Sequence, residues 1–121
     1  MGILQAKIDI TSSDLLNTPL ALNTTRNLTV TQGGILLKEI DAVSDGTSVV
    51  LIAQADHAEG TKVYIRNRHA ANTLNVKFVA ANQIDLVIAP GQWTFFPWKA
   101  AVDLKVWASA ADTIVEYGTF M

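Results

Sequence analysis

The feature that most constrains this chain is a repeated alternation of polar and apolar residues with a period of two. In residues 4–10 the even positions are apolar and the odd positions are polar. Successive side chains of a β-strand point to opposite faces of a sheet, so this pattern is typical of a strand with one buried face. No segment longer than one turn shows convincing helical periodicity. The sequence therefore predicts an all-β protein.

The same alternation recurs along the chain and marks further strands. It is found in residues 27–31, 61–67, 74–78, 103–108 and 113–119. Residues 35–43 are less regular and fit either a bulged strand or the first turn of a helix. Residues 48–53 and 84–88 are apolar runs, typical of strands covered on both faces, although Asp85 interrupts the second.

Turn-forming residues separate these segments. The sequence has Gly33-Gly34, Asp45-Gly46, Glu59-Gly60 and Pro90-Gly91 between the runs, where the backbone must reverse direction. About nine or ten short strands at this spacing predict a two-sheet antiparallel sandwich that is jelly-roll-like. No linker composition divides residues 1–121, which predicts a single domain. Residues 1–18 are expected to form an N-terminal strand and a loop able to extend to a neighbouring subunit.

Composition narrows the classes of function. Only 17% of the 121 residues are charged and mean hydropathy is +0.26, so we expect part of the surface to be covered by a partner or by further copies of the chain. A net charge of −2 argues against a general nucleic-acid binder. No apolar run approaches the roughly 20 residues of a membrane helix. Residues 1–10 lack the apolar core of a signal peptide, so secretion is not expected.

The side chains that carry chemistry are few. The absence of cysteine excludes disulfides and thiolate metal sites. Asp56, His57 and Glu59 share one short segment, but their spacing matches no zinc signature, and His69 follows a predicted strand. The carboxylates are scattered, without a pair that suggests glycoside hydrolysis. We therefore predict a binding or structural protein that is not an enzyme and holds no cofactor or metal.

Basic residues are concentrated in one stretch. Residues 61–80 contain Lys62, Arg66, Arg68 and Lys77 and no acid. One interpretation is a positive patch that docks on an acidic partner or on a neighbouring subunit. The other is a solvated face whose charges are balanced by acids from another strand. Arg66 and Arg68 are retained as candidate partner-binding residues.

Aromatic residues cluster in residues 93–98. On a strand Trp93 and Phe95 share one face, whereas Phe96 and Trp98 share the other. One core cannot accept both faces, so we expect part of this cluster to contact another subunit or a partner. Pro97 interrupts ladder pairing and favours an edge strand. The alternatives are a sugar-stacking platform that uses Trp93 and Trp98, or aromatic residues that only cover the sandwich edge.

Residues 62–121 resemble a known pattern of motifs. A strand ends in Arg66-Asn67, and a turn leads to the segment from Leu74 to Phe78. An apolar strand runs into Pro90-Gly91-Gln92, and a short strand closes on Phe96-Pro97. The segment from Leu104 to Ala108 follows, and the chain finishes on Val115-Glu116-Tyr117. This order is similar to that of small β-sandwich virion proteins of tailed bacteriophages, most of all the head decoration or cement proteins.

The resemblance implies a structural role. Such proteins dock on the outside of the capsid and brace neighbouring subunits of the major capsid protein, which would be the partner here. It implies a homo-oligomer, either a dimer or a trimer, on the capsid exterior of a virion, made in the host cytoplasm. A head-fibre, tail or baseplate component is an alternative within the same resemblance, and a carbohydrate-binding module is the alternative outside it.

Overall fold

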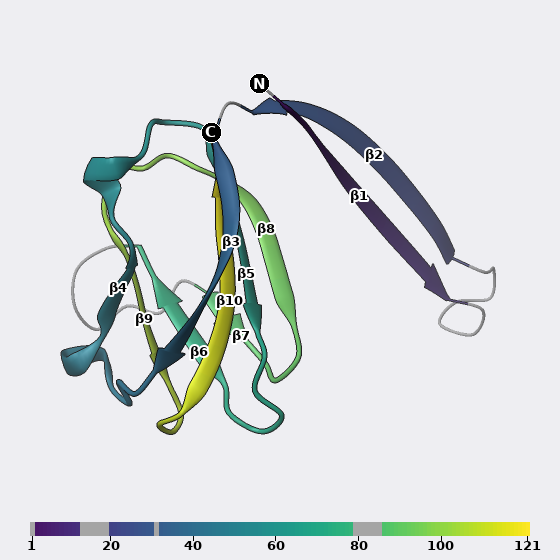
Figure 1. Cartoon of the computed structure of the whole chain (residues 1–121). Coiled ribbons are helices and arrows are strands. Elements are labelled where there is room, and N and C mark those ends of the chain that lie inside the picture. The colour runs from purple at the N-terminus through teal and green to yellow at the C-terminus, as the bar shows by residue number, and fades with distance from the viewer. Residues whose placement is uncertain (1, 13–19, 31, 79–85) are drawn as a thin grey trace. The chain divides into compact units, whose positions relative to one another are not determined.

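A computed structural model describes residues 2–12, 20–30, 32–78 and 86–121. The chain divides into two compact units, residues 1–31 and 32–121 (Figure 1). Every described element of more than one turn is a β-strand, which confirms the all-β prediction. Within the described ranges, no helix has the length and apolarity needed to cross a membrane.

The first unit is a two-stranded antiparallel sheet, which we call the N-terminal hairpin. Strands β1 (Gly2–Ser12) and β2 (Leu20–Val30) pair continuously, from Gly2 opposite Val30 to Ser12 opposite Leu20. The alternation sorts the side chains: Leu4 lies opposite Leu28 on one face, and Gln5 lies opposite Asn27 on the other. The strand predicted at residues 4–10 is confirmed as part of β1, whereas β2 begins at Leu20, well before the strand predicted at residues 27–31.

The described residues of the second unit, 32–78 and 86–121, form eight strands and two single-turn 3₁₀ helices, η1 (Asp45–Thr47) and η2 (Gln54–Asp56). Sheet I has the order β3 (Gly33–Ile40), β10 (Thr113–Phe120), β5 (Thr61–Asn67), β8 (Trp93–Trp98). Sheet II has the order β4 (Val49–Ile52), β9 (Leu104–Ala108), β6 (Leu74–Lys77), β7 (Leu86–Ile88). The two sheets pack face to face as a sandwich (Figure 1).

The strand order follows a nested pattern. β3 pairs with β10, β4 with β9, β5 with β8 and β6 with β7, all antiparallel. The first strand of the second unit therefore pairs with the last strand, the second pairs with the last but one, and this continues to the central pair of β6 and β7. This nesting of antiparallel pairs over two four-stranded sheets is the topology of a jelly roll. The two-sheet sandwich predicted from the sequence is the architecture of the second unit.

The core lies between the two sheets. The strand β5 shows the pattern most clearly, because Val63 and Ile65 are fully buried while the alternate residues Lys62, Tyr64 and Arg66 are half-buried. Aliphatic side chains of both sheets complete the core: Ile40, Leu51, Ile52, Leu74, Val76, Ile88, Leu104, Val106 and Val115. Burial of this one-sided apolar set is the main source of stability of such a sandwich.

Three segments differ from the sequence prediction. Residues 33–40 form β3 without a helical turn, and Gly33-Gly34 lies inside this strand instead of in a turn. β4 is one of the two edge strands of sheet II, and its Val50 is 38% exposed, so the expectation that this strand is covered on both faces is wrong at Val50. β7 begins at Leu86, and residues 84 and 85 of the predicted strand lie outside the described residues.

Candidate functional site

The pairing of β8 with β5 orients the aromatic cluster. Phe95 lies opposite Tyr64, and Trp93 lies opposite Arg66. Directly paired residues share a face. Because Val63 and Ile65 on β5 point into the core, Tyr64 and Arg66 point outward, and Trp93 and Phe95 point outward with them. The predicted sharing of one face by Trp93 and Phe95 is confirmed.

Phe96 and Trp98 lie on the inner side of the same strand. Trp98 is 5% exposed, and its ring centroid is 5.6 Å from that of His57. Phe96 makes an edge-to-face contact with Phe78, with centroids 5.6 Å apart. Both side chains pack in the core, so their assignment to a partner contact is corrected. A sugar platform made of Trp93 and Trp98 is likewise wrong, because the two rings are on opposite faces of β8.

The outward side of sheet I, which we call the outer face, continues the surface of Trp93 and Phe95 across all four strands. Its apolar members beyond β8 are Tyr64 on β5, Ile114 and Phe120 on β10, and Ile35 and Leu37 on β3, placed by the ladder register. Exposure is high at its two edges: 57% for Trp93 and 66% for Leu37. An exposed apolar surface of this kind marks an interaction site.

Two glycines flatten the outer face between β10 and β3. A Cβ atom added at Gly118 would lie 2.5 Å from the carbonyl oxygen of Gly34. One added at Gly33 would lie 2.5 Å from Cδ1 of Phe120, so the Phe120 ring lies against the backbone of β3. These positions let neighbouring side chains lie flat on the sheet.

A polar network crosses the middle of the outer face. Tyr64 Oη donates a hydrogen bond of 2.8 Å to Glu116 Oε1, and Arg68 Nη1 lies 3.0 Å from Glu116 Oε2. The hydrogen bond from Tyr64 lowers the pKa of Glu116, and the positive charge of Arg68 lowers it further. Burial and the Glu116 carboxylate together raise the pKa of Tyr64. The network therefore holds a carboxylate ionised among aromatic side chains.

The four basic residues predicted as a patch are not all on one surface: Lys62 and Arg66 point outward from β5, whereas Lys77 lies on sheet II. Arg68 pairs with Glu116, and Lys77 is buried on sheet II, where it pairs with Asp45. The interpretation in which acids from other segments balance the charge applies to these two. Arg66 remains on the outer face between Trp93 and Glu116, with its Nε buried and without a hydrogen-bond partner in the structure as described.

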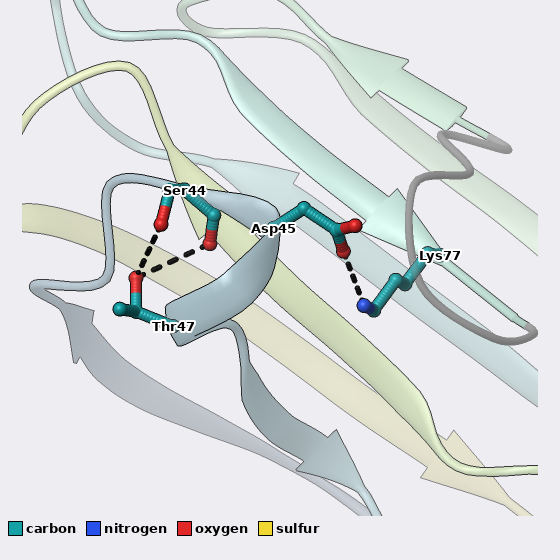
Figure 2. A network of polar contacts seen from close by, with 4 residues as sticks. All are labelled: Ser44, Asp45, Thr47 and Lys77. Carbon is teal, nitrogen blue, oxygen red and sulfur yellow. Dashed lines mark hydrogen bonds and ion pairs between the residues drawn. The ribbon is translucent and has the colours of Figure 1, made fainter.

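The Lys77–Asp45 ion pair fastens η1 to the outward side of sheet II (Figure 2). The Lys77 ammonium also lies 5.8 Å from the centre of the Trp107 ring. Ser44 and Thr47 close the turn by side-chain and backbone hydrogen bonds of 2.9–3.2 Å (Figure 2). This arrangement has a structural explanation, because it holds the Lys77 ammonium near Trp107, which is buried although it points away from the core.

Both histidines serve the fold. His57 Nδ1 is 2.8 Å from the Ala53 carbonyl oxygen and must donate to it, while Nε2 is 3.2 Å from Thr119 Oγ1. His69 Nδ1 accepts hydrogen bonds from the backbone N–H groups of Ala71 and Asn72. Each ring is therefore engaged in holding a turn, and the segment with Asp56 and Glu59 gains no metal-binding geometry from His57.

Acidic side chains meet at one end of β3 and β10. Among the residues that the structure describes, Glu39, Asp41 and Asp112 form the one group of three whose ligand atoms lie within 4.8 Å of one another, and all three are exposed. Asp112 and, less strongly, Asp41 raise the pKa of Glu39. A hydrogen bond between the Glu39 and Asp112 carboxyl groups, followed by repulsion from the Asp41 and Asp112 charges, accounts for this rise in pKa.

Comparison with known proteins identified no matching family model, no similar curated protein and no similar solved structure. The candidate site therefore rests on the geometry of the chain itself. Of the six predicted partner-binding residues, the structure places Trp93, Phe95 and Arg66 on the outer face and Arg68 beside it through Glu116. Ile35, Leu37 and Phe120 were not predicted, because the pairing of β3 with β10 that adds them is set by long-range contacts.

Proposed function

We propose that this protein is a structural protein of a phage virion, a decoration or cement protein that docks on the outside of the head and braces major capsid subunits. The observation that carries the proposal is the apolar and aromatic outer face of sheet I, with Trp93 at one edge and Leu37 at the other. A protein that braces others requires such an adhesive surface and no catalytic machinery.

The composition of the outer face favours a protein partner. Tryptophan, tyrosine and arginine dominate the binding energy of protein interfaces, and Trp93, Tyr64 and Arg66 occur together here. The Tyr64–Glu116–Arg68 network supplies fixed polar groups within the apolar surroundings. Interfaces commonly combine apolar anchors with satisfied polar groups in this way.

The choice of the capsid as partner rests on the resemblance of residues 62–121 to phage decoration proteins. The jelly-roll topology is compatible, because this architecture recurs in viral capsid domains and also in lectins. A fold alone does not define a function, so the topology serves here only as support for the sequence pattern.

Heads of the encoding phage that lack this protein provide the direct test. We expect the purified protein to bind them in stoichiometric amounts and to raise the temperature at which they release DNA. Trp93→Ala is expected to weaken binding at least tenfold, because it removes an exposed aromatic anchor. The matched control is Val87→Ala, which truncates a residue of sheet II that is 62% exposed. Unchanged heat tolerance together with absent binding would reject the proposal.

A carbohydrate-binding module is the second candidate, and the exposed ring of Trp93 next to Phe95 and Arg66 is the observation in its favour. A planar ring suits the face of a sugar, and nearby polar groups suit its hydroxyls. Saturable binding to one glycan on an array, lost in Trp93→Ala and retained in Trp98→Phe, would support this candidate over the capsid role.

A further inference from the structure

The strand β3 is the edge of sheet I and is unusually apolar for an edge. It pairs with β10 on one side, and no other described strand pairs with it. Ile35, Leu36 and Leu37 are consecutive and 57%, 61% and 66% exposed, so both faces of the strand present large apolar side chains to solvent. Edge strands usually carry charges, prolines or bulges that prevent pairing with another chain. Residues 33–37 have none of these.

The hydrogen-bond pattern identifies which backbone groups of β3 are directed away from β10. Gln32 and Met121 exchange both of their backbone hydrogen bonds, at 3.1 and 2.8 Å. In an antiparallel ladder these exchanges recur at every second residue, so the backbone N–H and C=O groups of residues 34, 36, 38 and 40 point toward β10. The N–H and C=O groups of Gly33, Ile35, Leu37 and Glu39 therefore point to the open side of the strand.

We propose that β3 pairs with β3 of a second copy of this chain, antiparallel, about a twofold axis at Leu36. In this register Ile35 of one copy lies opposite Leu37 of the other, and the two Leu36 residues face each other. All of the outward-directed backbone groups from Gly33 to Glu39 then form hydrogen bonds, since each of these residues meets another of the same set. The three exposed apolar residues of one copy cover those of the other.

Charge argues against the two registers whose axis lies nearer the C-terminal end of β3. An axis at Leu37 would place Ile35 opposite Glu39 and Leu36 opposite Lys38, and an axis at Lys38 would place two ammonium groups face to face. Like charges directly opposite each other destabilise a sheet, and charges opposite apolar residues gain no contact. With the axis at Leu36, Lys38 and Glu39 lie opposite Gly34 and Gly33, which leaves both charged side chains room to reach solvent. An axis at Ile35 brings no like charges together, but it places Leu36 and Leu37 opposite Gly34 and Gly33, so only the two Ile35 side chains meet an apolar partner. The edge is thus most self-complementary with the axis at Leu36, and an interface with twofold symmetry requires such self-complementarity.

The proposed dimer joins two copies of sheet I into one continuous eight-stranded sheet. Its outer surface would combine the two outer faces, with Ile35 and Leu37 in the middle and Trp93 at both far edges. This inference concerns a second copy of the chain and the edge of β3. It does not depend on the capsid proposal, and the experiments below use the purified protein alone.

Disulfide trapping tests the register, because the chain has no cysteine of its own. In an antiparallel pair without mutual hydrogen bonds, opposite Cα atoms are about 4.5 Å apart, within the range that a disulfide spans. We expect Leu36→Cys to form a covalent dimer under mild oxidation in high yield. Ile35→Cys and Leu37→Cys are each expected to yield at least tenfold less when alone. Identical residues at these positions would be roughly 8–9 Å apart, beyond the reach of a disulfide. A mixture of the two is expected to cross-link.

Light-scattering mass of the unmodified protein provides a test without cysteines. We expect the mass of a dimer, and that of a monomer for Leu36→Lys, which places two ammonium groups opposite each other. Val87→Lys, an equally exposed edge residue on sheet II, is the control and should leave the mass unchanged. A monomeric wild type, an unchanged mass for Leu36→Lys, or cross-linking of Leu37→Cys in preference to Leu36→Cys would each overturn the proposed pairing.

Discussion

The side-chain amide of Asn67 donates a 3.0 Å hydrogen bond to the carbonyl oxygen of Ile88 and thereby connects sheet I to sheet II. The same amide donates to the Asn72 carbonyl at 2.7 Å, and its oxygen accepts from the backbone N–H of His69. Asn67 is fully buried at the end of β5. One polar side chain therefore satisfies three backbone groups where the two sheets and a turn meet.

Asn67→Ala is expected to destabilise the protein by about 3 kcal/mol. The substitution leaves the carbonyl groups of Ile88 and Asn72 without this donor, and unpaired buried polar groups cost roughly 1–3 kcal/mol each. Urea unfolding measures the loss. Asn75→Ala, at a half-buried position on the outward side of sheet II, is the control and is expected to change stability by less than about 1 kcal/mol. Equal effects of the two variants would contradict the role assigned to Asn67.

Asp45→Ala is expected to destabilise the protein by about 3 kcal/mol, because it leaves the Lys77 ammonium buried without its carboxylate. Adding Lys77→Met to this variant should restore most of the loss, since Met removes the unpaired charge and keeps the contact with Trp107. Thermal unfolding of both single variants and the double variant measures this coupling. Additive losses in the double variant would show that the pair is not an energetic unit.

Glu39→Gln is expected to raise the melting temperature at pH 7. Asp112 and Asp41 raise the pKa of Glu39 in the folded state above its ordinary value. The folded state therefore retains a proton that the unfolded state releases, and stability falls as the pH rises through this interval. The advantage of the variant should disappear near pH 3, where the carboxyl group is protonated in both states. Glu59→Gln, an exposed acid outside this cluster, is the control.

Tyr64→Phe is expected to raise the pKa of Glu116, because it removes the hydrogen bond that contributes most to lowering this pKa. The stabilisation linked to Glu116 is present at neutral pH and is lost as the pH falls through the lowered folded-state pKa. NMR titration of the Glu116 carboxyl carbon measures the shift directly. Tyr117→Phe is the comparison, since Tyr117 lies on the inward side of β10. An unmoved pKa in Tyr64→Phe would mean that Arg68 and Arg66, and not the tyrosine hydroxyl, lower the pKa of Glu116.

The strands and their buried faces were largely predictable, because a period of two is a local property. The alternation in residues 61–67 matches β5 at both ends. The same period of two, applied to residues 93–98, correctly predicted that Trp93 and Phe95 share one face. Contacts between side chains that are distant in the sequence were not predictable. Lys77 and Asp45 are 32 positions apart, and no pattern near either residue indicates that they meet.

The exposed edge of β3 was missed for a related reason. The sequence around Ile35 to Leu37 is apolar, and an apolar segment is normally taken to be buried. Its exposure depends on which strand takes the edge position of sheet I and on what covers that position. Both are properties of the assembled sandwich, so they become visible only once the ladder order is known.

The outward position of Trp93 also has a practical consequence for spectroscopy. The chain has three tryptophans, and the fold places them in three environments: Trp93 exposed on the outer face, Trp98 in the core beside His57, and Trp107 buried on the outward side of sheet II next to Lys77. A soluble collisional quencher reaches the first and not the other two. The emission of one unlabelled sample can therefore separate events at the outer face from loosening of the sandwich or release of η1.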